Sequence, residues 1–307
     1  MFKIAFSNVL IILLFVLMGY LLCKTKKAKS EHLPTLSAVL IYLGNPCLII
    51  SAFTSLDYST KHLKNMGLFF IISLILQLAF IGVTFLFVKS RYEQPKYRIF
   101  NVACVLGNVG FFGLPVIQAL FPSNPEVASY SVVYIISMNI ILFTIGAFCL
   151  TKDKRYMSIK SAFINPAILG LIIGLPLFLL SNKFTLPSAL TNGIGVVGKM
   201  TTPLCMFILG IRLATVSFKK LFTRPMVYLT IACKLLVYPL FCYALVYFLP
   251  LPLVFKGSVL VLSSTPCASK LLSLSELYDG EKELTANSIL LSTLLCFITV
   301  PLLTLLI

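Results

Sequence analysis

The chain has 307 residues, of which 59% are hydrophobic and 11% are charged, and its formal net charge is +16. A soluble domain carries about 25% charged residues, so this composition leaves too little polar surface to cover a water-soluble globule. The positive charge does not indicate a nucleic-acid partner, because no basic patch with interleaved aromatic residues lies outside the apolar runs.

Apolar runs of about 20 residues, the length that crosses a hydrocarbon layer of ~30 Å as a helix, recur along the whole sequence. They lack the alternation of apolar and polar residues that a transmembrane β-barrel requires. We therefore predict an all-α, multi-pass membrane protein with about ten spans. In chain order the predicted spans are 4–23, 34–55, 65–88, 98–120, 126–150, 160–181, 188–212, 225–249, 254–276 and 284–307.

Basic residues gather in the loops that follow the odd-numbered spans. Because Lys and Arg are retained on the cytoplasmic side, these loops are predicted to be cytoplasmic. Both termini are then expected on the other side of the plasma membrane. The residues are Lys24, Lys26, Lys27, Lys29, Lys89, Arg91, Lys96, Arg98, Lys152, Lys154, Arg155, Lys160, Arg212, Lys219, Lys220, Arg224 and Lys282. The opposite loops hold Lys3, Lys61, Lys64 and Lys183.

The basic loop after the fifth span divides the chain into two five-span halves, 1–152 and 153–307. An odd number of spans forces the second half to enter the membrane from the opposite side. The halves are therefore predicted to be inverted repeats, an arrangement common in secondary transporters. Asn45-Pro46 in the second span and Thr202-Pro203 in the seventh are an internal echo of this kind.

The fourth span contains a segment that a helix cannot easily tolerate, between residues 106 and 115. Pro115 cannot donate to the carbonyl four residues back, and Gly107, Gly110 and Gly113 give a helix little support. In lipid, each freed backbone group costs several kcal/mol unless it lines a cavity or is buried in protein. We therefore predict a polar cavity at mid-membrane depth, where Asn108 offers amide donors and a carbonyl acceptor.

The ninth span carries a corresponding interruption. Its polar and helix-breaking residues are Ser263, Ser264, Thr265, Pro266, Cys267, Ser269 and Lys270. If the two interruptions cross, the free N–H groups and positive dipole ends of the half-helices point to one place, which suits an anion. Gly and Pro also serve as kinks and packing residues in membrane helices. Their matching positions in the two halves favour a binding site.

Four lysines, Lys199, Lys234, Lys256 and Lys270, lie within the predicted spans seven to nine, whereas no Asp or Glu lies deep in any span. Ionisable side chains inside a membrane are costly and commonly functional. Lys199 and Lys256 are placed to reach the interface. Lys234 is deeper, and Lys270 adjoins the interruption. The uncompensated positive charge favours an anionic solute, while backbone carbonyls of broken helices leave Na⁺ open as a coupling ion.

Enzyme chemistry, a bound metal and a cofactor are not expected. His32 and His62 lie near loops, the spans contain no paired carboxylates, and the nine cysteines form no CxxC pair. Walker-type glycines are also missing, so the sequence gives no support for direct ATP drive.

Several ordered segments make the chain similar to the auxin efflux carrier family, also described as malate/malonate permease or membrane transport proteins. These segments are Gly44-Asn45-Pro46, residues 107–115, Asn165 to Gly170, Pro203 to Gly210, Thr265 to Ser269, Leu277 to Gly280, Ser292-Thr293 and Pro301. The short loop after the fifth span resembles that of compact bacterial members.

The resemblance implies a scaffold made of spans 4–23, 34–55, 160–181 and 188–212. It also implies a transport unit, 65–150 and 225–307, that moves like an elevator. The substrate-facing asparagine of the family falls at Asn108 and its crossing proline at Pro266. Lys270 departs from the small or amide residue of many relatives, which leaves the solute and the coupling ion, Na⁺ or H⁺, open. Relatives of this shape are often homodimers.

The leading interpretation is a secondary transporter that moves a small organic anion, with a carboxylate favoured, by alternating access. The alternatives are a Na⁺-coupled symporter of the bile-acid transporter type, a channel and a membrane sensor. The expected substrate-binding residues are Asn45, Gly107, Asn108, Gly110, Gly113, Pro115, Thr265, Pro266, Cys267, Ser269 and Lys270. The expected supporting or ion-site residues are Lys199, Thr202, Lys234, Ser263 and Ser264.

Overall fold

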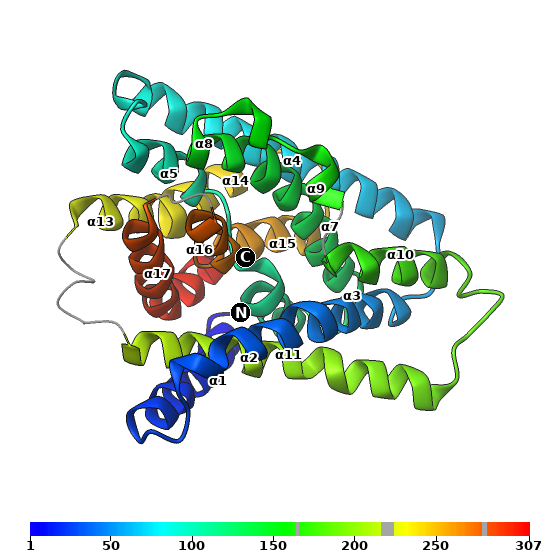
Figure 1. Cartoon of the computed structure of the whole chain (residues 1–307). Coiled ribbons are helices and arrows are strands. Elements are labelled where there is room, and N and C mark those ends of the chain that lie inside the picture. Colours follow the sequence, from blue (N-terminus) through cyan, green and yellow to red (C-terminus); the bar gives the residue numbers. More distant parts are fainter. Residues whose placement is uncertain (164–165, 216–223, 278–280) are drawn as a thin grey trace.

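The structure, a computed structural model, describes residues 1–163, 166–215, 224–277 and 281–307. Within these ranges every regular element is a helix, which confirms the predicted all-α class (Figure 1). Asn165 and residues 278–280, which belong to segments singled out in the sequence, lie outside the described residues, as do Lys219 and Lys220.

The first half of the chain begins with one long helix and then shows several interrupted ones. Its helices are α1 (Phe2–Lys24), α2 (Leu33–Val39), α3 (Asn45–Thr54), α4 (Thr60–Val88), α5 (Pro95–Ala103), α6 (Leu114–Leu120), α7 (Glu126–Ile141) and α8 (Ala147–Thr151). Short helical turns connect them: η1 (Ser30–His32), η2 (Leu40–Gly44), η3 (Lys89–Arg91), η4 (Val109–Gly113) and η5 (Leu142–Gly146).

The second half repeats this mixture of long and interrupted helices. Its helices are α9 (Ile159–Phe163), α10 (Pro166–Leu179), α11 (Ser188–Thr215), α13 (Pro225–Ala232), α14 (Tyr238–Tyr247), α15 (Leu253–Ser263), α16 (Ser269–Leu277) and α17 (Lys282–Leu303). The short turns are η6 (Lys154–Tyr156), η7 (Cys233–Val237) and η8 (Thr304–Leu306).

Prolines account for three of the widened, π-helical turns. Each of the three turns η2, η4 and η7 ends two residues before a proline; these prolines are Pro46, Pro115 and Pro239, respectively. A proline has no N–H to donate and crowds the carbonyl four residues back, so the preceding turn widens. Pro203, the partner of Pro46 in the sequence echo, instead lies inside the continuous helix α11.

Seven helical stretches in the described residues are long and apolar enough to cross a membrane. They are Phe2–Lys24, Ser30–Thr54, Thr60–Arg91, Glu126–Thr151, Ser188–Thr215, Pro225–Tyr247 and Lys282–Leu306. The other predicted spans, the fourth, sixth and ninth, correspond to the shorter apolar helices Val109–Leu120, Ile168–Leu179 and Leu253–Ser263. In the fourth and ninth, the interruption shortens the continuous helix.

The helices gather in two groups. In Figure 1, α1, α2, α3 and α11 lie together in the lower part of the molecule, whereas α4, α5 and α8 lie in the upper part. Helix α1 packs along α11, and α3 packs against both α10 and α11. In the other group, α4 packs against α7, and α14 packs against α15.

Two glycines allow α1 and α11 to approach each other at backbone distance. A side chain at Gly19 would collide with the Phe207 carbonyl, and one at Gly210 would collide with the Val16 carbonyl. In lipid, helix association depends on this kind of close van der Waals packing of small residues. The α1–α11 contact is therefore closed to larger side chains at both positions.

We expect Gly210→Ala to destabilise the protein by roughly 1–3 kcal/mol, because the added methyl group meets helix α1 backbone and forces the two helices apart. The matched control is Gly67→Ala, since no atom lies within 4 Å of the position of its added Cβ. Thermal unfolding in detergent, followed by the reaction of buried thiols with a fluorescent dye, measures both. Equal unfolding temperatures for the two variants would contradict the packing described here.

Candidate functional site

The interruptions of the fourth and ninth spans cross and pair through their backbones. Helix α5 ends at Ala103 and α15 at Ser263. Beyond these ends, Gly107 and Cys267 form an isolated antiparallel bridge. The Asn108 N–H donates to the Pro266 carbonyl at 2.7 Å, and the Ala268 N–H donates to the Leu106 carbonyl at 3.0 Å. Each interruption thus supplies backbone partners that the other would otherwise lack inside the membrane.

Glycines at the crossing leave room for the neighbouring segment. A Cβ at Gly107 would collide with the Thr265 hydroxyl and lie 3.1 Å from the Lys234 ammonium. A Cβ at Gly113 would lie 2.8 Å from the Thr265 methyl group. These two positions therefore need glycine so that the interrupted segments can touch.

Lys234 is fully buried beside the crossing. Its Nζ donates to the Ser263 carbonyl at 2.7 Å and lies 4.8 Å from the centre of the Tyr238 ring. Ser263 ends helix α15, and the carbonyls at a helix C-terminus carry the negative end of the helix dipole. The ammonium therefore has a compensating partner, and Lys234 fastens η7 to the end of α15.

Lys270 lies on the other side of the crossing, one residue into α16. Its Nζ donates to the Asn139 Oδ1 at 3.0 Å. Asn139 is buried in α7, and its Nδ2 is among the few buried side-chain atoms that have no hydrogen-bond partner within the described part of the chain. Asn139 was not among the residues predicted from the sequence, although a side-chain amide within the predicted fifth span was the signal that could have identified it.

A cavity of about 870 Å³ extends to Lys270 from the ends of several helices. One wall consists of α2, η2 and α11, and the other of η4, η5, α16 and α17. At its deep end the cavity is lined by Asn45, Phe111, Cys205, Ser269 and Lys270. Ser30, Arg212, Glu276, Lys282 and Glu283 also line it, in or near the loops after the first, seventh and ninth predicted spans.

Asn108 lies behind this deep end rather than in its lining. The residue is 8% exposed, and its side chain lies beside the thiol of Cys205, which does line the cavity. Asn108 directly precedes η4, and Cys205 lies on α11. Their proximity therefore joins the two walls of the cavity.

Several hydroxyl groups of the ninth span are occupied by their own helix. Ser263, Ser264 and Thr265 donate to the carbonyls three residues earlier, at 2.9, 2.8 and 2.9 Å. All three are buried, and none lines the cavity within the described chain. Their side chains cap the broken end of α15, as expected for residues that offer local hydrogen bonds to a backbone.

The remaining predicted residues fall into two sets. Gly110, Pro115, Pro266 and Cys267 lie at or next to the crossing, where the Cys267 N–H donates to the Ser292 hydroxyl at 3.0 Å. Lys199 and Thr202 lie on α11, where Lys199 is exposed, and neither is among the residues that line the cavity.

We expect Lys234→Met to destabilise the protein by about 1–3 kcal/mol, because the buried Ser263 carbonyl loses its donor. Lys256→Met is a close control. Its ammonium also donates to a carbonyl, that of Tyr247 at 2.7 Å, and lies over the Tyr247 ring, but Lys256 is only half-buried and this hydrogen bond is exposed. Unfolding temperatures of the purified variants measure the difference. The assignment of Lys234 as an internal tie is wrong if both variants unfold at the same temperature.

Comparison with known proteins relates this sequence to membrane transport proteins. The family model described as "Membrane transport protein" matches residues 4–304, a range that includes both interruptions. An uncharacterized transporter of Methanocaldococcus jannaschii is 26% identical over 300 residues, with 96% of each chain covered. An uncharacterized transporter of Methanothermobacter thermautotrophicus is 26% identical over 307 residues, again with 96% of each chain covered.

Proposed function

The chain belongs to the membrane transport protein family, and from this premise we propose that it is a secondary transporter for a small organic anion, with a carboxylate favoured. The observation that carries this proposal is the cavity that ends at the Lys270 ammonium beside two crossing, interrupted helices. In transporters built from broken helices, such places hold the solute near the middle of the bilayer.

The deep end of the cavity is rich in donors and has a net positive character. Lys270 provides an ammonium group, and helix α16 begins at Ser269, so its first N–H groups lie beside that ammonium. The unpaired Nδ2 of Asn139 lies next to Lys270 but behind the cavity wall, since Asn139 is buried and does not line the cavity. A carboxylate accepts hydrogen bonds from an ammonium group and from the first N–H groups of a helix, and charge-assisted bonds are the stronger ones. An inorganic or organic cation would be repelled there.

The size of the cavity also supports a small solute. Sites for small molecules occupy roughly 300–1,000 Å³ and combine apolar walls with a few polar groups. Here the volume is about 870 Å³. Leu40, Ile208 and Leu209 are among the apolar residues along the walls. This arrangement fits an organic anion that has an apolar part as well as a charged group.

The position of the cavity between the two groups of helices supports a cycle of alternating access. Lys270 and Asn139 belong to one group, whereas Asn45 and Cys205 belong to the other. We propose that α1, α2, α3, α10 and α11 form the scaffold and that the other helices move as the transport unit. The proposed architecture is two inverted repeats of five spans, about ten in all.

The proposed orientation puts both termini outside the cytoplasm of a plasma-membrane protein, because Lys and Arg concentrate in the loops of the opposite side. The cavity mouth lies next to three of those basic loops, at Ser30, Arg212 and Lys282. The structure then corresponds to an inward-open state. A homodimer is compatible with this orientation.

We expect Lys270→Ala to lower carboxylate uptake into proteoliposomes by about tenfold or more, since loss of a charge-assisted hydrogen bond costs roughly 1.5–3 kcal/mol. Asn108→Ala should lower uptake as well, because the Asn108 side chain supports the cavity wall at Cys205. Lys199→Ala is the matched control, because this exposed lysine lies outside the cavity lining. Carboxylate transport at the wild-type rate in both site variants would refute the assignment of the site.

A Na⁺-coupled symporter of the bile-acid transporter type is the second candidate, since carbonyls of broken helices can bind Na⁺. At this crossing, however, the Ser263 carbonyl already accepts from the Lys234 ammonium. This contact favours a cycle in which the buried lysine supplies the positive charge that Na⁺ would otherwise bring, and it leaves H⁺ as the coupling ion to test.

We therefore expect uptake to persist when external Na⁺ is replaced by choline, with an imposed pH gradient present or absent. Initial rates of radiolabelled carboxylate uptake in the same proteoliposomes measure both conditions. A strict requirement for Na⁺ would establish the second candidate, whereas stimulation by the pH gradient alone would identify H⁺ coupling.

A further inference from the structure

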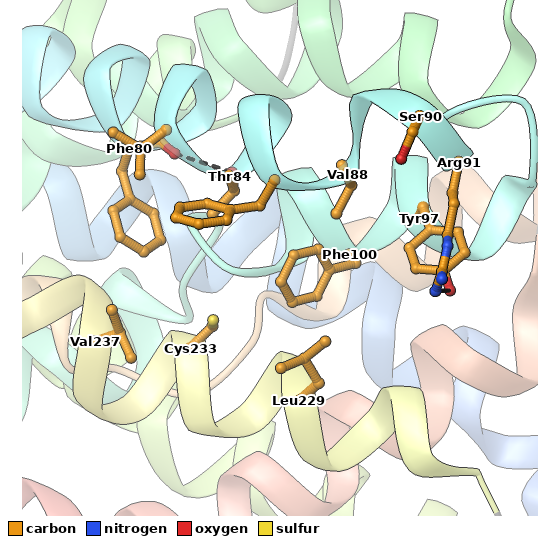
Figure 2. Close-up of a pocket in the computed structure, with 12 residues that line it drawn as sticks. Phe80, Thr84, Val88, Ser90, Arg91, Tyr97, Phe100, Leu229, Cys233 and Val237 are labelled. Carbon is orange, nitrogen blue, oxygen red and sulfur yellow. Dashed lines mark hydrogen bonds between the residues drawn. The ribbon is translucent and has the colours of Figure 1, made fainter.

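A second cavity, of about 460 Å³, is lined by other residues than the cavity of the proposed transport site. Figure 2 shows it as a groove between α4 on one side and α13 with η7 on the other. Its walls are mainly apolar and include Phe80, Phe100, Leu229 and Val237. Phe87, which also lines it, is 82% exposed, so the groove opens to the surroundings of the helices.

The groove has the dimensions of one acyl chain in one leaflet. It follows α4 from Phe80 to Val88, a helical rise of roughly 12 Å, and continues to Ser90 and Arg91. One leaflet contributes about half of a hydrocarbon layer of ~30 Å. A chain that enters at Arg91 and ends at Phe80 therefore spans most of the leaflet.

Exposed basic groups lie at the end of the groove that is formed by Arg91. The Arg91 guanidinium donates to the Tyr97 hydroxyl at 3.0 Å, and both side chains line the groove (Figure 2). The Lys96 ammonium lies 5.2 Å from the centre of the same Tyr97 ring. Lys89 is exposed two residues before Arg91, in the same turn, η3. Apart from Arg91, the groove residues carry no charge, so polarity changes sharply from this end to the other.

We propose that this groove binds an anionic phospholipid, with its phosphate at Arg91 and one acyl chain along Thr84, Phe100 and Leu229. Apolar walls recognise the chain, whereas Arg91, held by Tyr97, and Lys96 recognise the negative headgroup. A zwitterionic lipid offers the same chain but a neutral headgroup, so the preference for negative charge distinguishes this site from general contact with the bilayer.

The bound lipid would join two separate parts of the chain. Cys233 and Val237 on the far wall belong to η7, the turn that also contains Lys234. Phe80, on the near wall, packs against Tyr238 with ring centres 5.0 Å apart. An acyl chain in the groove therefore packs directly against the elements that hold the Lys234 contact in place.

The absence of Trp from the sequence makes a direct test available. Phe87→Trp puts a single fluorophore in the groove, and Leu86→Trp puts one at nearly the same depth on α4, outside the groove lining. Each variant is reconstituted in phosphatidylcholine with a minor fraction of phosphatidylglycerol that carries brominated acyl chains. Bromine quenches Trp fluorescence on contact. Brominated phosphatidylcholine at the same fraction is the reference.

We expect brominated phosphatidylglycerol to quench the groove reporter, Phe87→Trp, more strongly than brominated phosphatidylcholine does. The two lipids should quench the reporter outside the groove, Leu86→Trp, equally. Adding Arg91→Gln should lower the apparent affinity for phosphatidylglycerol by about fivefold, which is roughly 1 kcal/mol for one cation near an anionic headgroup. Lys27→Gln, which removes a charge from another basic loop, should leave the excess unchanged.

Two results would overturn the proposal. Equal quenching of the groove reporter by both lipids would show that the groove takes any acyl chain without regard to headgroup. If Arg91→Gln and Lys27→Gln lowered the apparent affinity for phosphatidylglycerol equally, the preference would result from the overall surface charge and not from this groove. Retention of phosphatidylglycerol by the unmodified protein and by Arg91→Gln, compared by native mass spectrometry, tests the same preference without an introduced Trp.

Discussion

Backbone hydrogen bonds between two interrupted helices hold the centre of this protein together. A helix that stops inside a bilayer leaves donors and acceptors that no water can satisfy. Here Asn108 and Ala268 donate across the crossing to Pro266 and Leu106, so each interruption stabilises the other. Because the partners come from opposite halves of the chain, neither interruption is stable without the other. The cavity, the buried lysine and the glycine positions all depend on this arrangement.

Three lysines show how depth and surroundings decide what a membrane cation does. Lys256 is half-buried and makes an exposed hydrogen bond to the carbonyl at the end of α14, as a side chain near the interface does. Lys234 has the same kinds of partner but is fully buried, so it fastens one helix to the end of another. Lys270 reaches a cavity and the Oδ1 of an asparagine whose Nδ2 has no partner within the described residues. Similar side chains therefore meet different surroundings, one inside the protein and one at a cavity.

The two cavities differ in what they can receive. The larger one lies between the two groups of helices and ends at polar groups, whereas the groove beside α4 is apolar along its length and charged only at one end. A solute that must leave the larger cavity again can make only a few polar contacts, and these must break when the two walls separate. A lipid that stabilises one wall needs a long apolar contact. The distinction follows from the position of the charges, at the deep end of one cavity and at the outer end of the other.

Local patterns in the sequence determined the all-α membrane class, the long spans and both interruptions, because apolar run length and the chemistry of Gly and Pro act over a few residues. The sequence also indicated that Lys234 was deep and that Lys270 adjoined an interruption. Only the tertiary structure decided that Asn108 lies beside Cys205 and that Asn139 joins Lys270. Asn139 and Lys270 are 131 positions apart, so their contact depends on how the helices pack rather than on any local pattern.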